Sequence, residues 1–119
     1  MYYICAMDIE NVQIQMRKGI LEYCILSIIA SKKEVYASDI LQILKEAKMI
    51  VVEGTLYPLL TRLRKSGLLN YRWVESQSGP PRKYYTLTDD GKKFVNELDT
   101  TWEELLHAVN ITTNKQLTQ

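Results

Sequence analysis

The sequence predicts a mainly α-helical fold with one small β-hairpin, built around a single core. Apolar residues recur at intervals of three and four in four segments, which is the period of helices that pack on a core. Between the third and fourth of these segments, two short stretches alternate apolar and polar residues around a Ser/Gly/Pro-rich centre, which is typical of a hairpin. The length of 119 residues and the hydrophobic content of 46% allow one core but not two.

The first two helices are predicted from the apolar pattern of the N-terminal third. Apolar residues at positions 14–29 are too dense for a helix with one apolar face, so we expect a central, largely buried helix that ends at the polar residues 31–33. A second, short amphipathic helix fits residues 38–48, and the Ser38 hydroxyl is suited to cap its first turn.

A third helix is predicted over residues 53–66, with Gly67 as its C-terminal stop. One face carries leucines at intervals of three and four: Leu56, Leu59, Leu60 and Leu63. Proline is tolerated near the first turn of a helix, so Pro58 favours a start at Glu53 or slightly later. Val52 stands where a capping Ser, Thr, Asn or Asp is expected, which leaves the exact start open.

Two aromatic-rich strands are predicted on either side of residues 76–81, forming a hairpin with a Ser/Gly/Pro tip. Their aromatic residues could stack on single-stranded bases, but aromatic residues in strands more often belong to the core, which is the interpretation we favour. These residues are Tyr71, Trp73, Tyr84 and Tyr85.

The last helix is predicted to begin near Asp89, with Thr88 as its cap and acidic residues in its first turn. Its apolar residues follow at spacings of four, four, three and four, a stripe that needs a partner. They are Phe94, Leu98, Trp102, Leu105 and Val109. Residues 110–119 have the polar composition of a frayed tail.

Charge is divided between two parts of the chain, although the formal net charge is only +1. Residues 61–88 carry six basic residues against Glu75 alone, whereas residues 94–109 carry four acidic residues and no Lys or Arg. Affinity for phosphate depends on the local density of Lys and Arg, so the first segment suits nucleic acid. Two surfaces with two functions are implied.

Patterns of an enzyme, a cofactor site or a metal site are missing from the sequence. His107 is the only histidine, Cys5 and Cys24 match no paired zinc or redox spacing, and no glycine-rich phosphate loop is present. Glu103 and Glu104 are adjacent and project about 100° apart on a helix, so we interpret the acidic residues of the last helix as a solvated face. We therefore expect thiols that are buried or have no chemical function, no catalysis, no cofactor and no metal.

No membrane segment is predicted, because the longest mostly apolar stretch, residues 23–30, is far shorter than the roughly 20 residues that a membrane helix needs. The N-terminal residues show no basic leader before an apolar run, so a secretory signal is not expected. We expect a cytoplasmic protein.

The predicted order of three helices, a hairpin and a long helix is that of a winged helix-turn-helix with a C-terminal extension. Residues 1–88 would form the winged helix-turn-helix domain, residues 89–109 a C-terminal dimerisation helix, and residues 110–119 a disordered tail. This layout makes binding of double-stranded DNA the leading hypothesis.

Two stretches of the sequence resemble the PadR family of bacterial transcriptional regulators. The first is EGTLYPLLTRL at 53–63, followed by GLL at 67–69, and the second is GPPRKYYTLT at 79–88, closed by Gly91. The resemblance runs from about residue 17 to residue 109 and includes Trp102; it departs at Ala37, where many members have glycine, and at Val52. It implies a homodimer that represses transcription from a palindromic operator and, in many members, is released by a small aromatic or lipophilic effector.

Residues for DNA contact are predicted on three elements. The third helix is the candidate reader of the major groove, where its hydroxyls reach bases or phosphates and its basic residues reach phosphates. The start of the second helix offers a phosphate contact or a cap alone, and the basic pair beside the hairpin tip would reach the backbone or the minor groove. The predicted residues are Ser38, Thr55, Tyr57, Thr61, Arg62, Arg64, Lys65, Arg82 and Lys83.

The apolar stripe of the last helix, from Phe94 to Val109, is predicted to form the dimer seam. A two-fold axis there would bring Trp102 near its symmetry mate, and the resemblance puts a tryptophan here in members that sandwich flat aromatic drugs. Nearby Asp99 and Glu103 would favour a cationic planar effector through charge, while the paired indoles would add stacking and cation–π attraction. Packing alone is the alternative for this tryptophan.

Two other functions keep the same fold. A protein-interaction module would be favoured if the basic stretch proved to be salt-bridged internally instead of lying on one face. A winged-helix RNA binder would be indicated by a preference for RNA over duplex DNA in competition.

Overall fold

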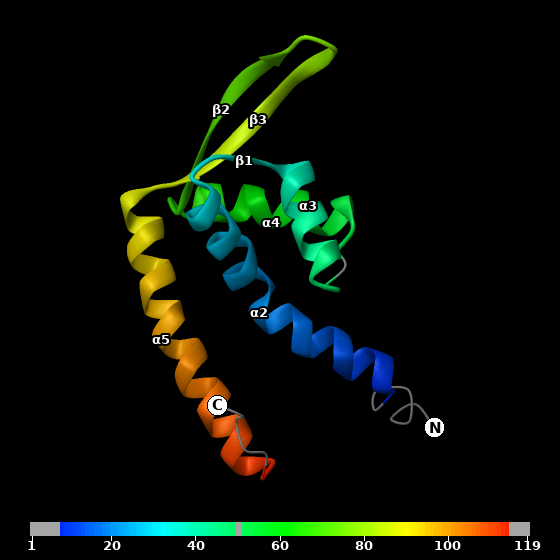
Figure 1. The fold of residues 1–119 in the computed structure, drawn as a ribbon, viewed down its shortest axis with the longest axis vertical. Helices are drawn as coiled ribbons and strands as arrows, with labels where there is room; N and C mark the ends of the chain where they lie inside the picture. Colours follow the sequence, from blue (N-terminus) through cyan, green and yellow to red (C-terminus); the bar gives the residue numbers. More distant parts are fainter. Residues whose placement is uncertain (1–7, 50, 115–119) are drawn as a thin grey trace.

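The computed structural model describes residues 8–49 and 51–114, so Cys5 and residues 115–119 of the expected tail lie outside the described residues. The chain is mainly helical with a small antiparallel sheet, as predicted (Figure 1). No described helix is long and apolar enough to cross a membrane. The elements are α2 (Ile9–Lys32), β1 (Val35–Tyr36), α3 (Ala37–Glu46), α4 (Glu53–Lys65), β2 (Leu69–Ser76), β3 (Gly79–Leu87) and α5 (Asp89–Thr112).

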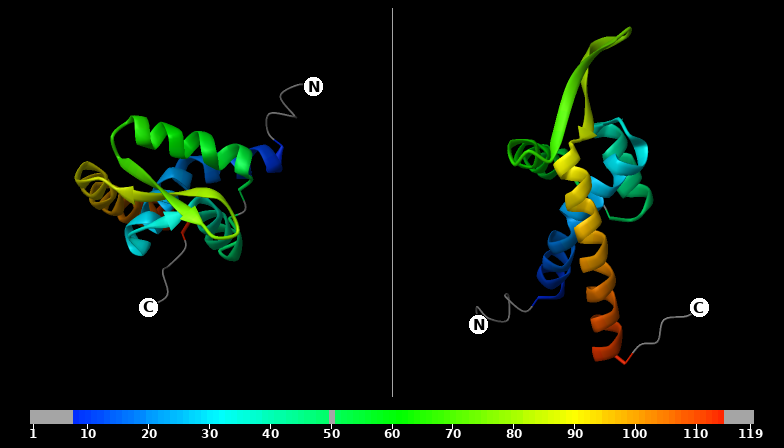
Figure 2. Two further views of the ribbon diagram at one scale, coloured as in Figure 1. Left: turned by 90° about the horizontal axis from the view of Figure 1, so that it is seen from above. Right: turned by 90° about the vertical axis from the view of Figure 1, so that its left-hand side faces the viewer.

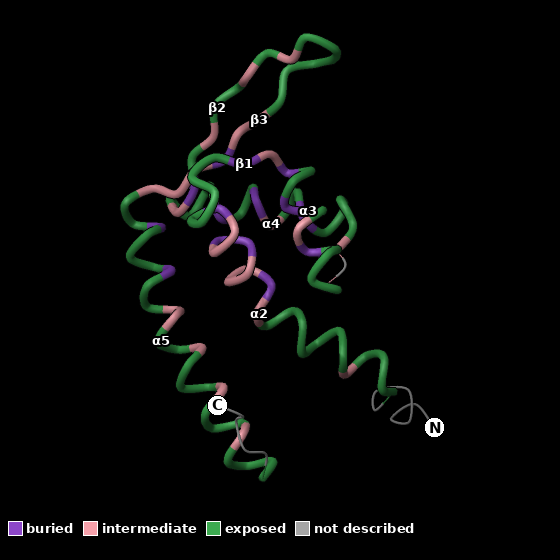
Figure 3. The backbone as a smooth tube through the Cα atoms, viewed as in Figure 1, coloured by how far each residue is buried: buried purple, intermediate pink, exposed green. Residues whose placement is uncertain are grey.

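Helix α2 is buried only in its C-terminal half, where Leu21, Ile25 and Ile29 enter the core. The N-terminal half extends away from the other helices, and its side chains are exposed: Ile14 is 51% and Met16 is 71% exposed (Figure 3). The prediction of a largely buried first helix is therefore wrong for this half. The segment is rich in apolar residues as expected, but no other described part of the chain covers Ile14 and Met16.

Helix α3 begins at Ala37, one residue before the predicted start, with Tyr36 in the cap position. The Asp39 carboxylate accepts a hydrogen bond from the Tyr36 backbone N–H at 3.2 Å. Ser38 is an exposed residue of the first turn and is not the cap, so its predicted capping role is wrong. The helix ends at Glu46, two residues earlier than expected.

Helix α4 buries Leu56, Leu60 and Leu63 against the core, which confirms the predicted leucine face. Its first turn has no side-chain cap at Val52. Pro58 is the sixth residue of the helix, one turn later than prolines are best tolerated, so it removes one hydrogen bond to the backbone of the first turn. Gly67 ends the helix as predicted, because its φ of 84° lies in the left-handed region.

The sheet has three antiparallel strands in the order β1-β3-β2. The hairpin of β2 and β3, here called the wing, projects away from the helices (Figures 1 and 2). Its turn is shorter than predicted, because Ser76 pairs with Gly79 and both prolines of the tip belong to β3. Strand β1 was not predicted, since two residues are too few to show an alternating pattern.

The core lies between the C-terminal half of α2, helices α3 and α4, and the root of the wing. Its fully buried side chains are Ile25, Leu26, Ile29, Ile40, Leu56, Leu60 and Leu69. Among the strand aromatics, Tyr85 is buried as expected. Trp73 is 60% exposed, so its assignment to the core is wrong.

Helix α5 begins at Asp89 as predicted, where the Thr88 hydroxyl accepts from the Gly91 N–H at 2.9 Å and donates to the Gly67 carbonyl at 2.7 Å. The helix continues to Thr112, so the first three residues of the expected tail are helical. The Tyr23 hydroxyl donates to Asp99 at 2.5 Å and ties α2 to α5. Beyond this tie the N-terminal part of α2 and the C-terminal part of α5 diverge (Figure 1).

Candidate nucleic-acid interface

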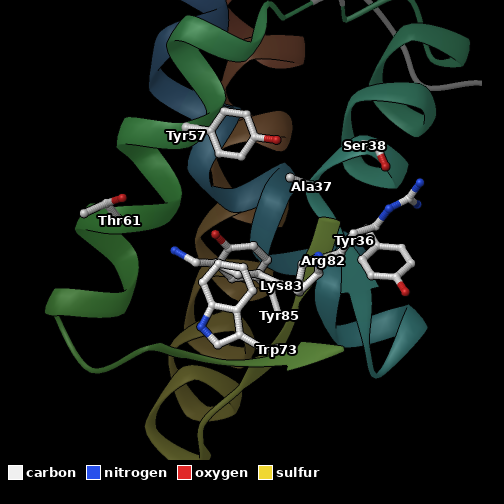
Figure 4. A pocket seen from close by; sticks show the side chains of 10 residues that line it. Tyr36, Ala37, Ser38, Tyr57, Thr61, Trp73, Arg82, Lys83 and Tyr85 are labelled. Atoms are coloured by element: carbon white, nitrogen blue, oxygen red, sulfur yellow. The ribbon is translucent and has the colours of Figure 1, made fainter. Parts of the chain in front are cut away.

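A hollow of about 440 Å³ separates the start of α3, the outer side of α4 and the wing (Figure 4). We call it the wing cleft, and it is lined by Tyr36, Ala37, Ser38, Tyr57, Thr61, Trp73, Pro81, Arg82, Lys83 and Tyr85. It brings together five of the nine residues that were predicted to contact DNA: Ser38, Tyr57, Thr61, Arg82 and Lys83. They come from all three predicted elements, which lie far apart in the sequence.

The helical period explains why Tyr57 and Thr61 reach this cleft. They lie about 100° and 140° from the buried Leu56 around the helix axis, so both face outward on the side of the wing. Tyr57 is 45% exposed, and its ring points across the cleft toward the start of α3 (Figure 4). A hydroxyl is therefore available on each of two successive turns.

Thr55 and Arg62 lie on the other side of α4, against α2. They line a separate hollow of about 450 Å³ together with Lys18 and Glu22. The Arg62 guanidinium donates twice to one Glu22 oxygen, from Nη2 at 2.6 Å and from Nε at 3.2 Å. The structure thus does not bring these two predicted contacts together with the wing cleft.

Arg64 and Lys65 are exposed near the end of α4. The Arg64 guanidinium lies 5.5 Å from the ring centre of Tyr71, on the side of α4 that faces the wing. Lys65 follows on the outermost side of the helix, opposite the buried leucines. Both charges border the wing cleft without lining it.

On the wing, Lys83 lies over two aromatic rings and Arg82 lies over one. The Lys83 ammonium is 4.4 Å from the ring centre of Tyr71 and 5.2 Å from that of Trp73. On the opposite face of the sheet, the Arg82 guanidinium is 5.0 Å from the ring centre of Tyr36. Such cation–π contacts restrict long side chains that would otherwise sample many rotamers.

Sequence reasoning missed Tyr36 and Trp73 as cleft residues. Trp73 shares a face with Lys83 because the two residues are cross-strand partners. That register depends on a two-residue turn together with a register shift between Val74 and Ser76, and the proline-rich tip concealed both. Tyr36 would have needed the unpredicted strand β1 to be placed beside β3.

Two of the six basic residues in the segment 61–88 are neutralised within the described part of the chain. Arg62 pairs with Glu22, and Arg72 pairs with Glu34 at 2.6 Å. The other four, Arg64, Lys65, Arg82 and Lys83, belong to none of the ion pairs found there. The basic stretch is thus only partly salt-bridged, which does not favour the protein-interaction alternative.

The predicted seam residues of α5 divide between two hollows. Phe94 and Leu98 face a hollow of about 400 Å³ near Tyr23 and Leu63, and Leu98 packs partly on the core. The remaining three, Trp102, Leu105 and Val109, line a mainly apolar hollow of about 470 Å³ with the N-terminal half of α2. We call this second space the α2–α5 hollow.

Neither of the two acidic residues predicted to attract a cation beside Trp102, Asp99 and Glu103, lines the α2–α5 hollow. Asp99 is outside the α2–α5 hollow and accepts the Tyr23 hydroxyl, a hydrogen bond that raises the pKa of Tyr23. Among the described residues, Arg17 is the only charged residue that lines the hollow. The predicted electrostatic preference for a cationic ligand therefore has no support in this geometry.

Within residues 8–49 and 51–114, no group of three or more His, Cys, Asp or Glu side chains is arranged to hold a metal ion. Cys24 is a half-buried free thiol, and burial raises its pKa. A raised pKa keeps the thiol protonated and lowers its reactivity.

Three core helices, a short strand and a hairpin define a winged helix-turn-helix protein, with hydroxyl and basic side chains in the cleft between α4 and the wing. The chain belongs to the transcriptional regulator PadR-like family, whose model matches residues 25–97. This confirms the resemblance found in the sequence. Proteins of this family are transcriptional regulators.

Solved structures agree with this membership. A PadR-like transcription factor from Bacteroides fragilis is 61% identical, with a TM-score of 0.72, over 86% of this chain and 98% of that chain. A PadR-like transcriptional regulator from Bacillus cereus is 38% identical, with a TM-score of 0.74, over 86% of this chain and 99% of that chain. The PadR protein of Bacillus subtilis, solved in complex with operator DNA, is 29% identical, with a TM-score of 0.61, over 66% of this chain and 45% of that chain.

Proposed function

We propose that this protein is a cytoplasmic, sequence-specific regulator that binds double-stranded DNA as a homodimer on a palindromic operator and represses transcription. The observation that carries the proposal is the wing cleft, where Ser38, Tyr57 and Thr61 meet Arg82 and Lys83. The similarity to the Bacillus subtilis protein that was solved with operator DNA supports it.

The chemistry of the cleft suits a duplex. A helix such as α4 fits the major groove, which is about 12 Å wide, and its N-terminal end favours an anion nearby. Hydroxyls of Tyr57 and Thr61 can donate to phosphate oxygens or to base edges. Arg82 and Lys83 would then meet the neighbouring backbone or the minor groove, since the wing projects beyond the helices.

Selection of bound sequences from random duplex DNA tests this function. We expect a motif with two-fold symmetry, whose half-sites lie about one helical turn apart, because dimer symmetry is mirrored in the operator. Competition with the same sequence as RNA and as single-stranded DNA should not displace the duplex. A selected motif without a dyad, or preferential binding to RNA, would contradict the proposal.

The proposed dimer is supported by apolar residues that this chain leaves uncovered. Ile14 and Met16 on α2 are exposed, and so are Leu105 and Val109 on α5, which are 49% and 47% exposed. All of them lie on the two diverging helix ends, and Met16, Leu105 and Val109 line the α2–α5 hollow. A second copy related by a two-fold axis would remove this apolar surface from water.

The α2–α5 hollow also supports a small planar aromatic effector. Trp102 is half-buried in its wall, and the other lining residues are mainly apolar. An indole offers a large flat area for stacking. Arg17, the charged residue of the lining, favours an anionic group on the ligand over the cationic group expected from Asp99.

A further inference from the structure

A column of side chains, two stacked tyrosines between two arginines, lies on the face of the sheet opposite to α4. The strand order β1-β3-β2 makes Tyr84 the cross-strand partner of both Tyr36 and Arg72. The rings of Tyr36 and Tyr84 are stacked, with centres 3.9 Å apart and planes inclined by 15°. The Arg72 guanidinium lies 5.3 Å from the centre of the Tyr84 ring.

Both ends of this column are occupied by charged groups. At one end, Glu34 holds Arg72 in a two-point contact, with Nε to Oε2 at 2.6 Å and Nη2 to Oε1 at 2.9 Å. The Arg72 hydrogen bonds keep the pKa of Glu34 below its usual range. At the other end, the Arg82 guanidinium lies 5.0 Å from the Tyr36 ring centre and also lines the wing cleft.

The charges of the column are distributed unequally. Glu34 neutralises Arg72, so Arg72 acts as a tether between the wing and the segment before β1. Arg82 belongs to none of the ion pairs in the described part of the chain, so its charge is available to a phosphate. Ordering a long arginine before binding reduces the entropy that the complex would otherwise lose.

We propose that Glu34, Arg72, Tyr84 and Tyr36 are positioning residues that hold the Arg82 guanidinium at the edge of the wing cleft, ready for a DNA phosphate. This inference rests on the proposed function, because it assumes that Arg82 contacts DNA. It assigns a role to an acidic residue, Glu34, at the margin of a surface that binds a polyanion. It also explains why a tyrosine pair occupies the exposed face of the sheet.

The direction in which one substitution changes DNA affinity distinguishes positioning of Arg82 from a general electrostatic effect. Glu34→Gln removes a negative charge near the proposed interface and frees Arg72, so electrostatics alone predicts tighter DNA binding. If the column positions Arg82, the same substitution weakens binding. We expect a loss of about two- to five-fold, the factor that corresponds to one exposed cation–π contact.

Glu22→Gln is the matched control. It removes the same charge and breaks the Arg62 ion pair, but it lies on α2 and contacts nothing in the column. Its affinity for operator DNA should equal that of the unmodified protein or exceed it. Thermal unfolding of both variants checks that the fold is retained.

A coupling experiment shows whether Glu34 acts through Arg82. In the Arg82→Ala protein, adding Glu34→Gln should cause no further loss, because the group that it positions is gone. Tyr84→Phe keeps the ring and should bind normally, whereas Tyr84→Leu breaks the stack and should bind as weakly as Glu34→Gln.

Each other outcome has a defined meaning. Tighter binding by Glu34→Gln, or an undiminished loss in the Arg82→Ala background, would overturn the positioning role while leaving the proposed function intact. Unchanged binding of Arg82→Ala itself would remove Arg82 from the DNA interface, and the inference would fall together with that part of the proposed function.

Discussion

Gly91 occupies a place where the backbone of α5 touches the turn before β2. A Cβ added at this position would lie 2.2 Å from the Leu68 carbonyl oxygen. That oxygen is held in place, because it accepts the Thr88 N–H at 3.1 Å. Replacing glycine by alanine in a helix ordinarily gains about 1 kcal/mol, but here the clash with fixed backbone opposes the gain.

We predict that Gly91→Ala lowers the free energy of unfolding by about 1–3 kcal/mol, the usual range for an overpacked site. Urea unfolding measures it from the midpoint at unchanged slope. Gly54→Ala is the control, since Gly54 is exposed in the first turns of α4 and a Cβ there meets no atom within 4 Å. The stability of the Gly54→Ala protein should stay the same or rise. If the Gly91→Ala protein were as stable as this control, the turn at Leu68 would have to move without a cost in stability.

The role of the wing in DNA binding is tested most directly by the salt dependence of the affinity. We predict that the double variant Arg82→Ala, Lys83→Ala binds all duplex sequences more weakly and shows a salt dependence reduced by about two units of slope. The reason is that each phosphate contact releases counterions without reading a base. Titrations with operator and unrelated duplexes at several salt concentrations measure both effects.

Lys92→Ala, Lys93→Ala provides a control for the loss of two charges. Both lysines are exposed on the first turns of α5, outside the wing cleft, and Lys92 lies 4.0 Å from Asp89. This variant should retain most of the salt slope. An equal reduction in both double variants would mean that net charge, and not the wing, determines the affinity.

At the scale of elements, local sequence patterns predicted where helices occur, but they did not predict which residues of other elements each helix contacts. The leucine period and Gly67 located α4 to within one residue, because both signals belong to the helix itself. Which side of α4 each polar residue uses depends on contacts that local patterns do not contain. Arg62 meets Glu22 forty residues away in the chain.

The candidate site shows the same difference between local signals and contacts of distant residues. The basic pair beside the hairpin tip could be recognised from charge and prolines alone, whereas its aromatic supports required the strand register. Trp73 pairs with Lys83 only because a two-residue turn is combined with a register shift between Val74 and Ser76. Tyr36 stacks on Tyr84 only because β1 joins the sheet. Pairing between distant strands is a property of the tertiary fold, so a single sequence gives little sign of it.

At the scale of the whole molecule, the proposed homodimer would cover the exposed apolar residues of α2 and α5. We predict that Leu105→Glu weakens dimerisation at least about tenfold, because it would bury a carboxylate against apolar side chains. Sedimentation at micromolar concentration should show monomers of the variant and dimers of the unmodified protein. Operator affinity should fall as well, since each monomer would hold one half-site.

The matched control is His107→Glu, on the exposed face of the same helix and about 200° from Leu105 around its axis. This variant should remain dimeric. If both variants dimerised normally, the seam would lie on another surface, and the apolar stripe of α5 would need a different partner.

A last prediction concerns the effector and Trp102. Titration of the dimer with a planar dye should quench tryptophan emission saturably, because stacking on an indole in the α2–α5 hollow brings the two ring systems into contact. The test compares the affinities of an anionic and a cationic dye that have the same ring system. Arg17 predicts that the anionic dye binds more tightly, and Arg17→Gln should abolish this difference.

Trp73 also fluoresces and is exposed on the wing, so quenching alone does not identify the binding site. The Trp102→Ala variant identifies the binding site. It should bind the dye far more weakly and still bind operator DNA. In the unmodified protein, bound dye should lower the affinity for operator DNA, and bound operator should lower the affinity for the dye. This follows if the two ligands prefer different arrangements of the two subunits. Equal dye affinity in Trp102→Ala would leave the α2–α5 hollow as a dimer contact without a sensing role.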